Sequence, residues 1–164
     1  MSDVGAFRKP GAVLFACNFN VVRSPMAEAL LKRLAADHIY VDSCGLHSPK
    51  GRPDHGHEGL DPFAIQVMEE IGHDLGGHRP KTFDELDDES FDLIVSLTPQ
   101  AQHRAVEMTR GRAAEIEYWP TFDPTLVEGG REARLEAYRT VRDALAAQIK
   151  RRFADIVVAG ASRA

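Results

Sequence analysis

Short apolar runs alternate with longer amphipathic segments along most of the 164-residue chain. The runs have the length of buried strands, and the longer segments carry apolar residues at the three- and four-residue spacing of a helix. The runs that we expect to be strands are residues 12–16, 39–43, 91–97 and 115–119. The segments that we expect to be helices are residues 25–37, 61–72, 100–110 and 132–153, with one helical turn at 82–86.

This alternation of strands and helices predicts a parallel sheet that is covered on both faces. Right-handed crossovers make such a sheet doubly wound, and its ligands bind beyond the carboxyl ends of the strands. We therefore expect an α/β fold over residues 1–164, a single doubly wound domain with a four-stranded parallel sheet and helices on both faces. Residues 1–11 read as a loose N-terminal lead-in.

The composition narrows the class of protein without changing this fold. A hydrophobic content of 43% and a charged content of 27% are ordinary for a soluble globular domain. The net charge of −5 argues against nucleic acid or an anionic membrane as the main partner, so an anionic substrate would have to be attracted locally. No apolar run has the length of a membrane span, and no segment is a convincing export signal. Two cysteines are too few for a disulfide scaffold, which indicates a reducing, cytoplasmic location.

Most of the candidate chemistry lies in residues 12–34. The first apolar run ends at Cys17, and Arg23 follows after a loop of five residues. Ser24 is a good N-cap residue and Pro25 is tolerated in a first helical turn, so a helix is expected to begin there. A helix N-terminus attracts anions and favours a nearby thiolate, and arginine offers a planar fork of donors that fits phosphate. The pattern predicts a thiolate nucleophile in a phosphate-sized cradle.

Two other interpretations of Cys17 have to be considered. A free cysteine is often no more than a small buried core residue. Arg8, Lys9, the apolar run and Cys17 also imitate a bacterial lipoprotein signal. That signal is disfavoured because the apolar region is too short and the chain continues as a regular helix.

The loop resembles the active-site loop of the low-molecular-weight protein tyrosine phosphatase family, which usually reads C-x-G-N-x-C-R-S-P-M-A-E. Here it reads CNFNVVRSPMAE from Cys17 to Glu28. The wider superfamily includes thiol-dependent arsenate reductases and reads C-x-x-N-x-x-R-S. Phe19 and Val22 depart from the phosphatase pattern, because they stand where the family usually has Gly and a second Cys. The resemblance implies a phosphate-binding loop made of Asn18, Phe19, Asn20, Val21, Val22, Arg23 and Ser24.

A phosphatase that uses a thiolate also needs a proton for the leaving oxygen, which a carboxyl group can supply. Asp123-Pro124 follows the fourth expected strand, and a parallel sheet would return it to the edge where Cys17 lies. In the family an Asp-Pro pair at this late position carries the general acid, so Asp123 is the candidate. The other interpretation is that Asp-Pro only initiates a turn.

Three further residues are candidates for supporting roles. Ser24 is expected to donate a hydrogen bond to the Cys17 sulfur, or simply to cap the helix. Asn20 is expected to shape the loop, because Asn tolerates a left-handed backbone. The resemblance implies that Ser43, in a Ser-x-Gly segment, braces Asn20, although it could be an ordinary hydroxyl at a strand end. No metal and no cofactor are expected.

The departures from the family pattern bear on the substrate and on redox chemistry. Phe19 would be strained if its backbone needed a positive φ, and would otherwise add an apolar wall to the mouth of the site. The family often has Tyr after the Asp-Pro pair, where this chain has Thr125. The candidates for an aromatic contact with phosphotyrosine are Phe19, Phe122 and Trp119, although Trp119 is better explained as a packing residue. Cys44 is interpreted as a small buried residue or as a redox partner of Cys17.

The loop at residues 46–59 raises the question of a metal site. It contains His47, Asp54, His55, His57 and Glu58. Nothing in their spacing fixes a coordination geometry, and the segment is rich in glycine, so a solvated loop is favoured.

These observations leave three functions open. The first is a cysteine-dependent phosphomonoester hydrolase acting on a phosphorylated protein or a small aryl phosphate, with a phosphate- or sulfate-like anion held in the loop. The second is an arsenate reductase that uses an external thiol, because residues 78–92 contain no cysteine for an internal disulfide relay. The third is a degenerate phosphatase that binds phosphate without turnover, which Phe19 suggests and the retained Cys17, Arg23, Ser24 and Asp123 oppose.

Overall fold

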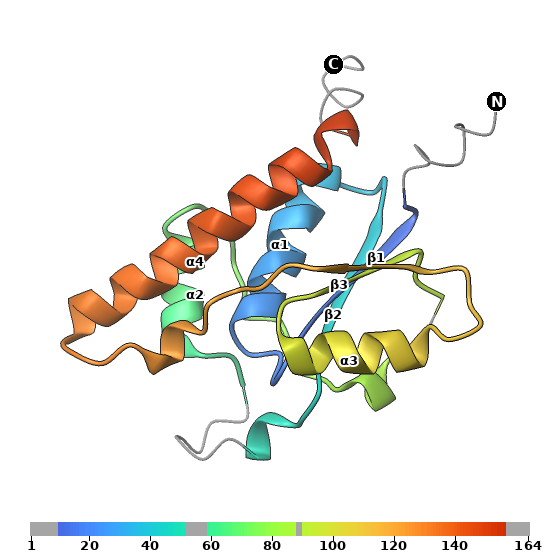
Figure 1. Cartoon of the computed structure of the whole chain (residues 1–164). Helices are drawn as coiled ribbons and strands as arrows, with labels where there is room; N and C mark the ends of the chain where they lie inside the picture. The colour runs from blue at the N-terminus through green and yellow to red at the C-terminus, as the bar shows by residue number, and fades with distance from the viewer. Residues whose placement is uncertain (1–9, 52–58, 88–89, 157–164) are drawn as a thin grey trace.

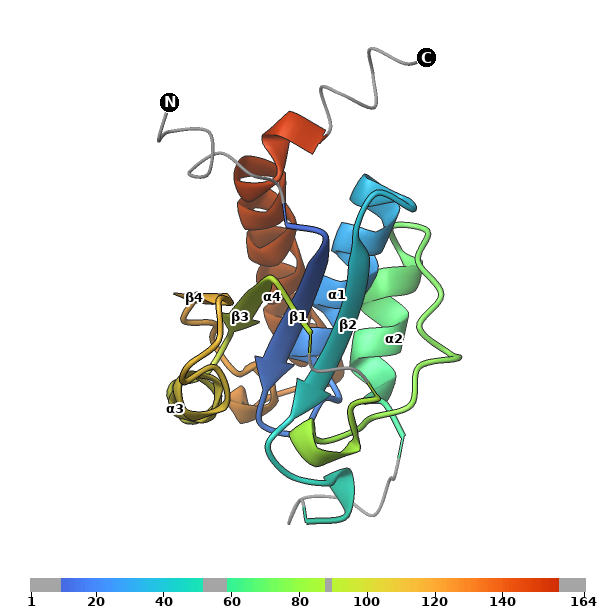
Figure 2. The ribbon, with the colours of Figure 1, turned by 90° about the vertical axis from the view of Figure 1, so that its right-hand side faces the viewer.

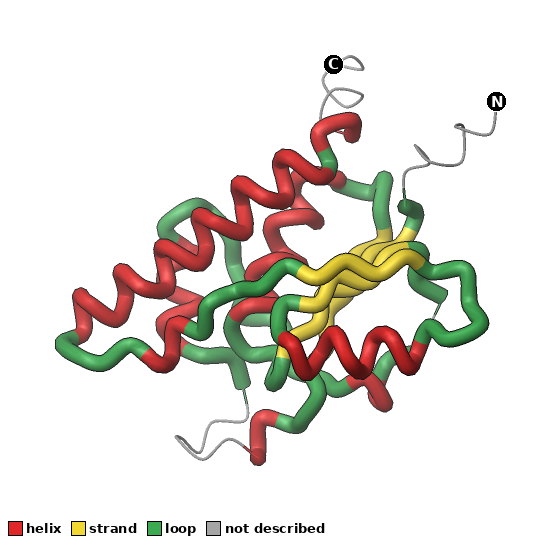
Figure 3. Tube along the Cα trace, in the orientation of Figure 1, coloured by secondary structure: helices red, strands yellow, loops and turns green. Residues whose placement is uncertain are grey.

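The computed structural model of the chain describes residues 10–51, 59–87 and 90–156. Almost all of the expected N-terminal lead-in lies outside these ranges. The sheet lies between the helices (Figures 1 and 3), and its four parallel strands follow the order β2-β1-β3-β4 (Figure 2). The strands are β1 (Ala12–Cys17), β2 (Tyr40–Gly45), β3 (Leu93–Ser96) and β4 (Glu115–Tyr118). The sheet confirms the predicted α/β fold class and its four parallel strands.

Helices cover both faces of the sheet, three on one face and one on the other (Figure 2). The first face carries α1 (Arg23–Ala35), α2 (Pro62–Glu69) and α4 (Arg131–Arg152), and the second carries α3 (Pro99–Met108). Short 3-10 helices occupy Pro49–Gly51, Phe83–Glu85 and Pro124–Leu126. The alternation of side chains along β1 divides the core, since Val13, Phe15 and Cys17 face the three-helix side. Leu14 and Ala16 face α3.

Several element boundaries differ from the expected ones by two or three residues. The second strand runs two residues beyond the expected end at 43, because Gly45 pairs with Cys17 and also bridges to Thr82. Helix α1 begins at Arg23, two residues earlier than expected. Helix α2 ends at Glu69 rather than at 72, where Gly72 has φ 84°. The helical turn expected at 82–86 is a 3-10 helix at Phe83–Glu85. A capping box between Thr82 and Glu85 stabilises its N-terminus.

The parallel arrangement brings four connections to one edge of the sheet, as is usual at the carboxyl ends of such strands. These connections follow Cys17, Gly45, Ser96 and Tyr118. Trp119 follows the last residue of β4 and is only 5% exposed. Its ring lies edge-on to Phe15, so it packs in the core. Among the described residues, none of the helices combines the length and the apolar character that a membrane crossing would require.

Candidate active site

Cys17 is the last residue of β1 and is only 3% exposed. Its Sγ lies 2.9 Å from the hydroxyl of Ser24, which is fully buried. Ser24 is therefore not the N-cap that we predicted. Val22 occupies the N-cap position without a side-chain cap, because α1 begins one residue before Ser24. This earlier start places the hydroxyl inside the first turn, where it faces the sulfur instead of a free backbone N–H.

Three carbonyl groups of the loop accept hydrogen bonds from backbone N–H groups of neighbouring segments. Leu46 N donates to Cys17 O (3.1 Å), His47 N to Asn18 O (2.9 Å), and Asp61 N to Val21 O (3.2 Å). In a planar trans peptide the N–H points away from the C=O of the same unit. The N–H groups that follow these carbonyls are therefore turned to the inside of the loop, and they belong to Asn18, Phe19 and Val22. Such inward N–H groups beside a helix N-terminus can bind an oxyanion.

Asn20 organises the middle of the loop. It is fully buried and has φ 60°, the left-handed conformation expected for it. Its Nδ2 donates to Ser24 Oγ (2.8 Å) and to Ser43 Oγ (2.9 Å), so the expected contact with Ser43 is present. Its Oδ1 accepts from Lys81 N (3.0 Å) and lies 3.0 Å from His78 Nε2. The amide oxygen can only accept, so His78 Nε2 carries its proton here.

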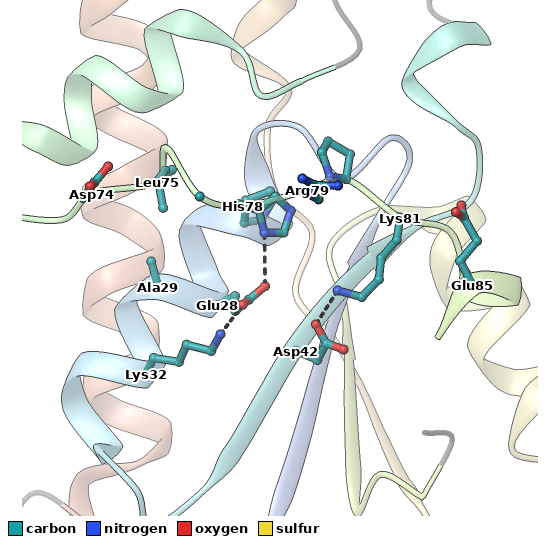
Figure 4. A pocket seen from close by; sticks show the side chains of 13 residues that line it. Glu28, Ala29, Lys32, Asp42, Asp74, Leu75, His78, Arg79, Lys81 and Glu85 are labelled. Carbon is teal, nitrogen blue, oxygen red and sulfur yellow. Dashed lines mark hydrogen bonds and ion pairs between the residues drawn. The ribbon is translucent and has the colours of Figure 1, made fainter. Parts of the chain in front are cut away.

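A second tier of charged residues supports Asn20. Ser43 Oγ donates to Glu28, which is 8% exposed, and Glu28 also pairs with Lys32. His78 Nδ1 lies 3.7 Å from the same carboxylate (Figure 4). Burial lowers the pKa of His78, and Lys81 acts in the same direction while Glu28 opposes it. For Lys81, burial alone would lower the pKa, but the hydrogen bond to Asp42 and its charge raise it overall.

An open groove of about 820 Å³ lies between α1, β2 and the segment that leads to the 3-10 helix at Phe83–Glu85 (Figure 4). It is lined by Glu28, Lys32, Asp42, His78 and Lys81, among others. His78 thus contacts the loop at Asn20, whereas Glu28 reaches Asn20 only through Ser43, and both side chains also line the groove. Sequence reasoning did not identify His78, Lys81 or Glu28 as supports. Glu28 was visible only as the last position of the matched loop pattern.

Gly45 is required by the close approach of two segments. A Cβ at this position would lie 2.7 Å from the carbonyl carbon of Phe19 and 2.8 Å from Asn20 N, which real contacts almost never allow. The Ser43-Cys44-Gly45 segment therefore packs directly against the loop backbone.

Arg23 and Asp123 meet at the opposite side of the loop. Arg23 is 9% exposed; its Nη1 donates to Thr121 O (3.0 Å) and its Nη2 lies 3.7 Å from Asp123 Oδ2. Asp123 Oδ1 accepts from Thr125 N (3.0 Å) and from Thr125 Oγ1 (2.7 Å). One carboxylate oxygen therefore forms the turn that we considered, and the other remains directed to Arg23. The side chain of Asp123 is 31% exposed.

The aromatic residues considered for substrate contact differ in backbone conformation and exposure. Among the described non-glycine residues, positive φ occurs at Asn20 and Ala36, so Phe19 has an ordinary backbone. Its ring is partly buried and lies 5.9 Å from the His47 ring at an angle of 49°. Phe122 is 58% exposed directly before Asp123. Trp119, by contrast, is buried and is not available as an aromatic contact.

Val22 and Cys44 are both core residues. Val22 is 4% exposed and packs in the cluster that contains Cys17. Cys44 is fully buried on the α3 side of the sheet, where burial, followed by the nearby Cys17, raises the pKa of its thiol well above the usual value. The structure therefore favours the interpretation of Cys44 as a small buried residue.

The metal ligands that we considered cannot be assembled from the described residues. His47 is exposed and lies beside Phe19, whereas Asp54, His55, His57 and Glu58 lie outside the described ranges. Within residues 10–51, 59–87 and 90–156, no group of three or more His, Cys, Asp or Glu side chains has the arrangement of a metal site.

Comparison with protein families and known structures places this site in a known context. Residues 12–157 match the family model described as low molecular weight phosphotyrosine protein phosphatase. The chain is 32% identical over 145 residues to the glutaredoxin arsenate reductase of Synechocystis, covering 88% of this chain and 95% of that protein. It is 28% identical over 138 residues to the arsenate reductase of Bacillus subtilis, covering 84% and 91%.

Two solved structures illustrate the range of relatives. An arsenate reductase in its phosphate-binding state has a TM-score of 0.66 and 29% identity, covering 88% of this chain and 98% of that one. The tyrosine phosphatase AmsI of Erwinia amylovora has a TM-score of 0.68 over 94% of this chain and 95% of that one. Its identity is 20%, so that likeness concerns the fold alone.

Proposed function

The chain belongs to the low molecular weight phosphotyrosine protein phosphatase family, and on that premise we propose that it is a cysteine-dependent phosphomonoester hydrolase. The observation that carries the proposal is the meeting of Arg23 and Asp123 at 3.7 Å beside the Cys17 loop. A nucleophile, an anion-binding arginine and a carboxyl group in one site are the parts that this chemistry requires.

The first step transfers the phosphoryl group to the enzyme. The Cys17 thiolate attacks phosphorus in line, the bond from phosphorus to the leaving oxygen breaks, and Asp123 gives its proton to that oxygen. The Ser24 hydroxyl stabilises the sulfur as nucleophile and later as leaving group. Arg23 and the inward N–H groups of the loop bind the equatorial oxygens, on which charge is spread in the transition state.

The second step returns the enzyme to its starting state. Asp123, now a carboxylate, takes a proton from a water molecule as that water attacks the cysteinyl-phosphate. The bond between phosphorus and sulfur breaks, inorganic phosphate leaves and the Cys17 thiolate is restored. Both cysteines are free, and a thiolate nucleophile has to stay reduced, so we place the reaction in a reducing compartment such as the cytoplasm.

The substrate that we propose is an aryl phosphate, either on a protein or as a small molecule. The partly buried ring of Phe19 and the exposed ring of Phe122 flank the catalytic residues in sequence, and both are available for contact with an aromatic leaving group. A phosphate- or sulfate-like anion is the expected occupant of the loop. The arsenate reductase structure in a phosphate-binding state supports this, since its chain is 29% identical.

A second function is supported by the names of the relatives, which are arsenate reductases at 28–32% identity. Arsenate is a tetrahedral oxyanion like phosphate, so the same cradle fits it. Its reduction to arsenite takes two electrons, which Cys17 and an external thiol would supply as they join in a disulfide, while one arsenate oxygen leaves as water with the two thiol protons. Cys44 is a poor internal partner because it is buried with a raised pKa on the other face of the sheet.

One pair of assays separates the two functions. We expect p-nitrophenyl phosphate to be hydrolysed at mildly acidic pH by the wild type, and the Cys17→Ser variant to lose about four or more decades of activity. Arsenate reduction is measured in parallel with glutathione and glutaredoxin as the thiol source. Arsenate reduction without hydrolysis would replace the phosphatase by the reductase. If neither reaction occurs while phosphate still protects Cys17 from alkylation, the protein only binds the anion.

A further inference from the structure

A buried hydroxyl on α4 lies at the end of a chain of contacts that leads to the phosphate loop. Tyr138 is 1% exposed, and its hydroxyl donates to Asp61 Oδ2 at 2.8 Å. Its ring packs edge-on against Phe63, with centroids 5.4 Å apart and an interplanar angle of 86°. These contacts hold the ring from the side, so the direction of the hydroxyl is fixed by the packing of α4 on α2.

Asp61 connects this hydroxyl to the loop. It is 6% exposed, and its Oδ1 accepts from Phe63 N at 2.9 Å, which makes it the N-cap of α2. Its own N–H donates to Val21 O at 3.2 Å. The same residue thus receives the Tyr138 hydroxyl, starts a helix and holds a carbonyl of the phosphate loop. A buried carboxylate with several partners has little freedom to move, because losing any partner is costly.

The contact with Val21 O decides the direction of the next N–H. Val21 C=O and Val22 N–H belong to one planar peptide unit and point in opposite directions. We propose that Tyr138 and Asp61 are positioning residues that keep the Val22 N–H turned toward the bound oxyanion. This proposal deepens the proposed function and rests on it for the identity of the anion as a phosphoryl group.

The other inward N–H groups have separate supports. The Asn18 N–H is oriented through Cys17 O and Leu46, and the Phe19 N–H through Asn18 O and His47. Neither route passes through α2 or α4. A change at Tyr138 is therefore expected to act on Val22, and on Arg23 that follows it, while Asn18 keeps its orientation.

The test compares Tyr138→Phe with a matched loss of a buried hydroxyl elsewhere. Thr109→Val is the control, since Thr109 is 8% exposed and its Oγ1 donates to Ala105 O (2.8 Å) at the end of α3. Inorganic phosphate is titrated into each ¹⁵N-labelled protein, and the amide signals of Val22 and Asn18 are followed. We expect Tyr138→Phe to weaken phosphate binding about three- to tenfold and to reduce the shift of Val22 but not of Asn18.

A purely structural role would give a different result. It would lower the melting temperature of Tyr138→Phe and Thr109→Val alike, and leave the affinity and the Val22 shift at wild-type values in both. That outcome would overturn the proposal. Where p-nitrophenyl phosphate is hydrolysed, kcat of Tyr138→Phe is expected to fall more than KM changes, because the N–H matters most in the transition state.

A second pair of variants and a binding measurement that needs no turnover keep the test decisive. Asp61→Asn retains the Oδ1 acceptor and the main-chain N–H, so its phosphate affinity is expected between those of the wild type and Asp61→Ala. Equal affinities for the wild type, Asp61→Asn and Asp61→Ala would also overturn the proposal, even if Tyr138→Phe did not fold. The phosphate titration needs no turnover, so a wild type that binds phosphate without hydrolysing aryl phosphates would refute the proposed function and still test the positioning role.

Discussion

The two cysteines of this protein lie on neighbouring strands, one residue out of register, and are both almost inaccessible. Cys17 pairs with Gly45, and Cys44 pairs with Ala16. Because side chains alternate along a strand, Cys17 faces the three-helix side and Cys44 faces α3. Their exposures are 3% and 0%, so burial alone does not distinguish the proposed nucleophile from a core residue.

Their polar surroundings make the difference. Cys17 ends its strand, so its sulfur meets the Ser24 hydroxyl and the inward N–H groups at the start of α1. Cys44 stands one residue before the end of β2, among Leu14, Ala16 and other apolar groups, and burial keeps its thiol protonated by raising its pKa. We therefore expect Cys17 to be the reactive thiol, because hydrogen-bond donors surround its sulfur at the end of β1.

The largest expected difference between the two thiols is their rate of alkylation. In the native protein iodoacetamide should modify Cys17 at least about three decades faster than Cys44, since Cys44 reacts only when the core opens. Peptide mass spectrometry after short exposure measures both rates, with protein in urea as the control. Inorganic phosphate should slow the reaction at Cys17 alone. Equal rates in the native protein would remove the distinction.

The next largest effect is expected at Asp123, the proposed general acid, which lies on the Cys17 side of the sheet. Asp123→Ala should slow aryl phosphate hydrolysis by roughly two to four decades, because the leaving oxygen loses its proton donor. Steady-state rates with p-nitrophenyl phosphate measure this loss. Thr125→Val is a matched control, since it removes a hydrogen bond to Asp123 Oδ1 without removing the acid. A loss of less than about threefold in Asp123→Ala would exclude Asp123 from that role.

Ser24→Ala makes the surroundings of Cys17 more like those of Cys44. Loss of a hydrogen bond to a charged sulfur should lower kcat about ten- to a hundredfold. The rate of p-nitrophenyl phosphate hydrolysis and the rate of Cys17 alkylation at pH 6 should fall together. Ser24→Thr, which keeps the hydroxyl, provides the comparison. An unchanged alkylation rate in Ser24→Ala would show that the 2.9 Å contact does not stabilise the thiolate.

His78 should make the stability of the folded protein depend on pH. Because burial lowers its pKa below the usual value of about 6.5, the unfolded chain binds a proton there before the native protein does. Its contribution to stability is complete above that value and is lost as the pH falls through the lowered pKa. Denaturation curves from pH 7 to 5 should show a smaller loss in His78→Ala than in the wild type. The same variant should lower kcat about two- to tenfold by leaving Asn20 Oδ1 with one donor fewer.

The smallest effect is expected at the second thiol. Cys44→Ala should change kcat by less than about twofold and lower the free energy of unfolding by about 1 kcal/mol, as a small cavity in the core does. Urea denaturation and p-nitrophenyl phosphate kinetics measure the two effects. A large loss of activity, or loss of thiol-dependent arsenate reduction, would return Cys44 to the role of redox partner.

The sequence was sufficient for the fold class and for the residues that have local signatures. The apolar run before Cys17 and the Asn at position 20 predicted a strand, a loop and a left-handed turn, and all three are present. The prediction that Ser24 caps the helix was wrong, because the local Ser-Pro rule cannot reveal that α1 begins one residue earlier and that the Ser24 hydroxyl lies 2.9 Å from the Cys17 sulfur.

The supports of the loop could not be found in the same way. His78 and Lys81 reach Asn20 across about sixty residues, and Tyr138 reaches Asp61 across 77. Such contacts depend on how helices and segments pack on the finished sheet, and no spacing in the chain encodes them. Asp61 was visible as the start of a helix, but its contact with Val21 was not.

The outward carbonyl groups of the loop have a thermodynamic consequence. Leu46, His47 and Asp61 orient its peptide units before any ligand arrives. The entropy of ordering this backbone is therefore lost during folding rather than during binding. An arriving oxyanion loses its own freedom and part of its hydration, but the loop needs little rearrangement. Contacts from distant parts of the chain thus raise the affinity for a small anion, because they order the loop before the anion binds.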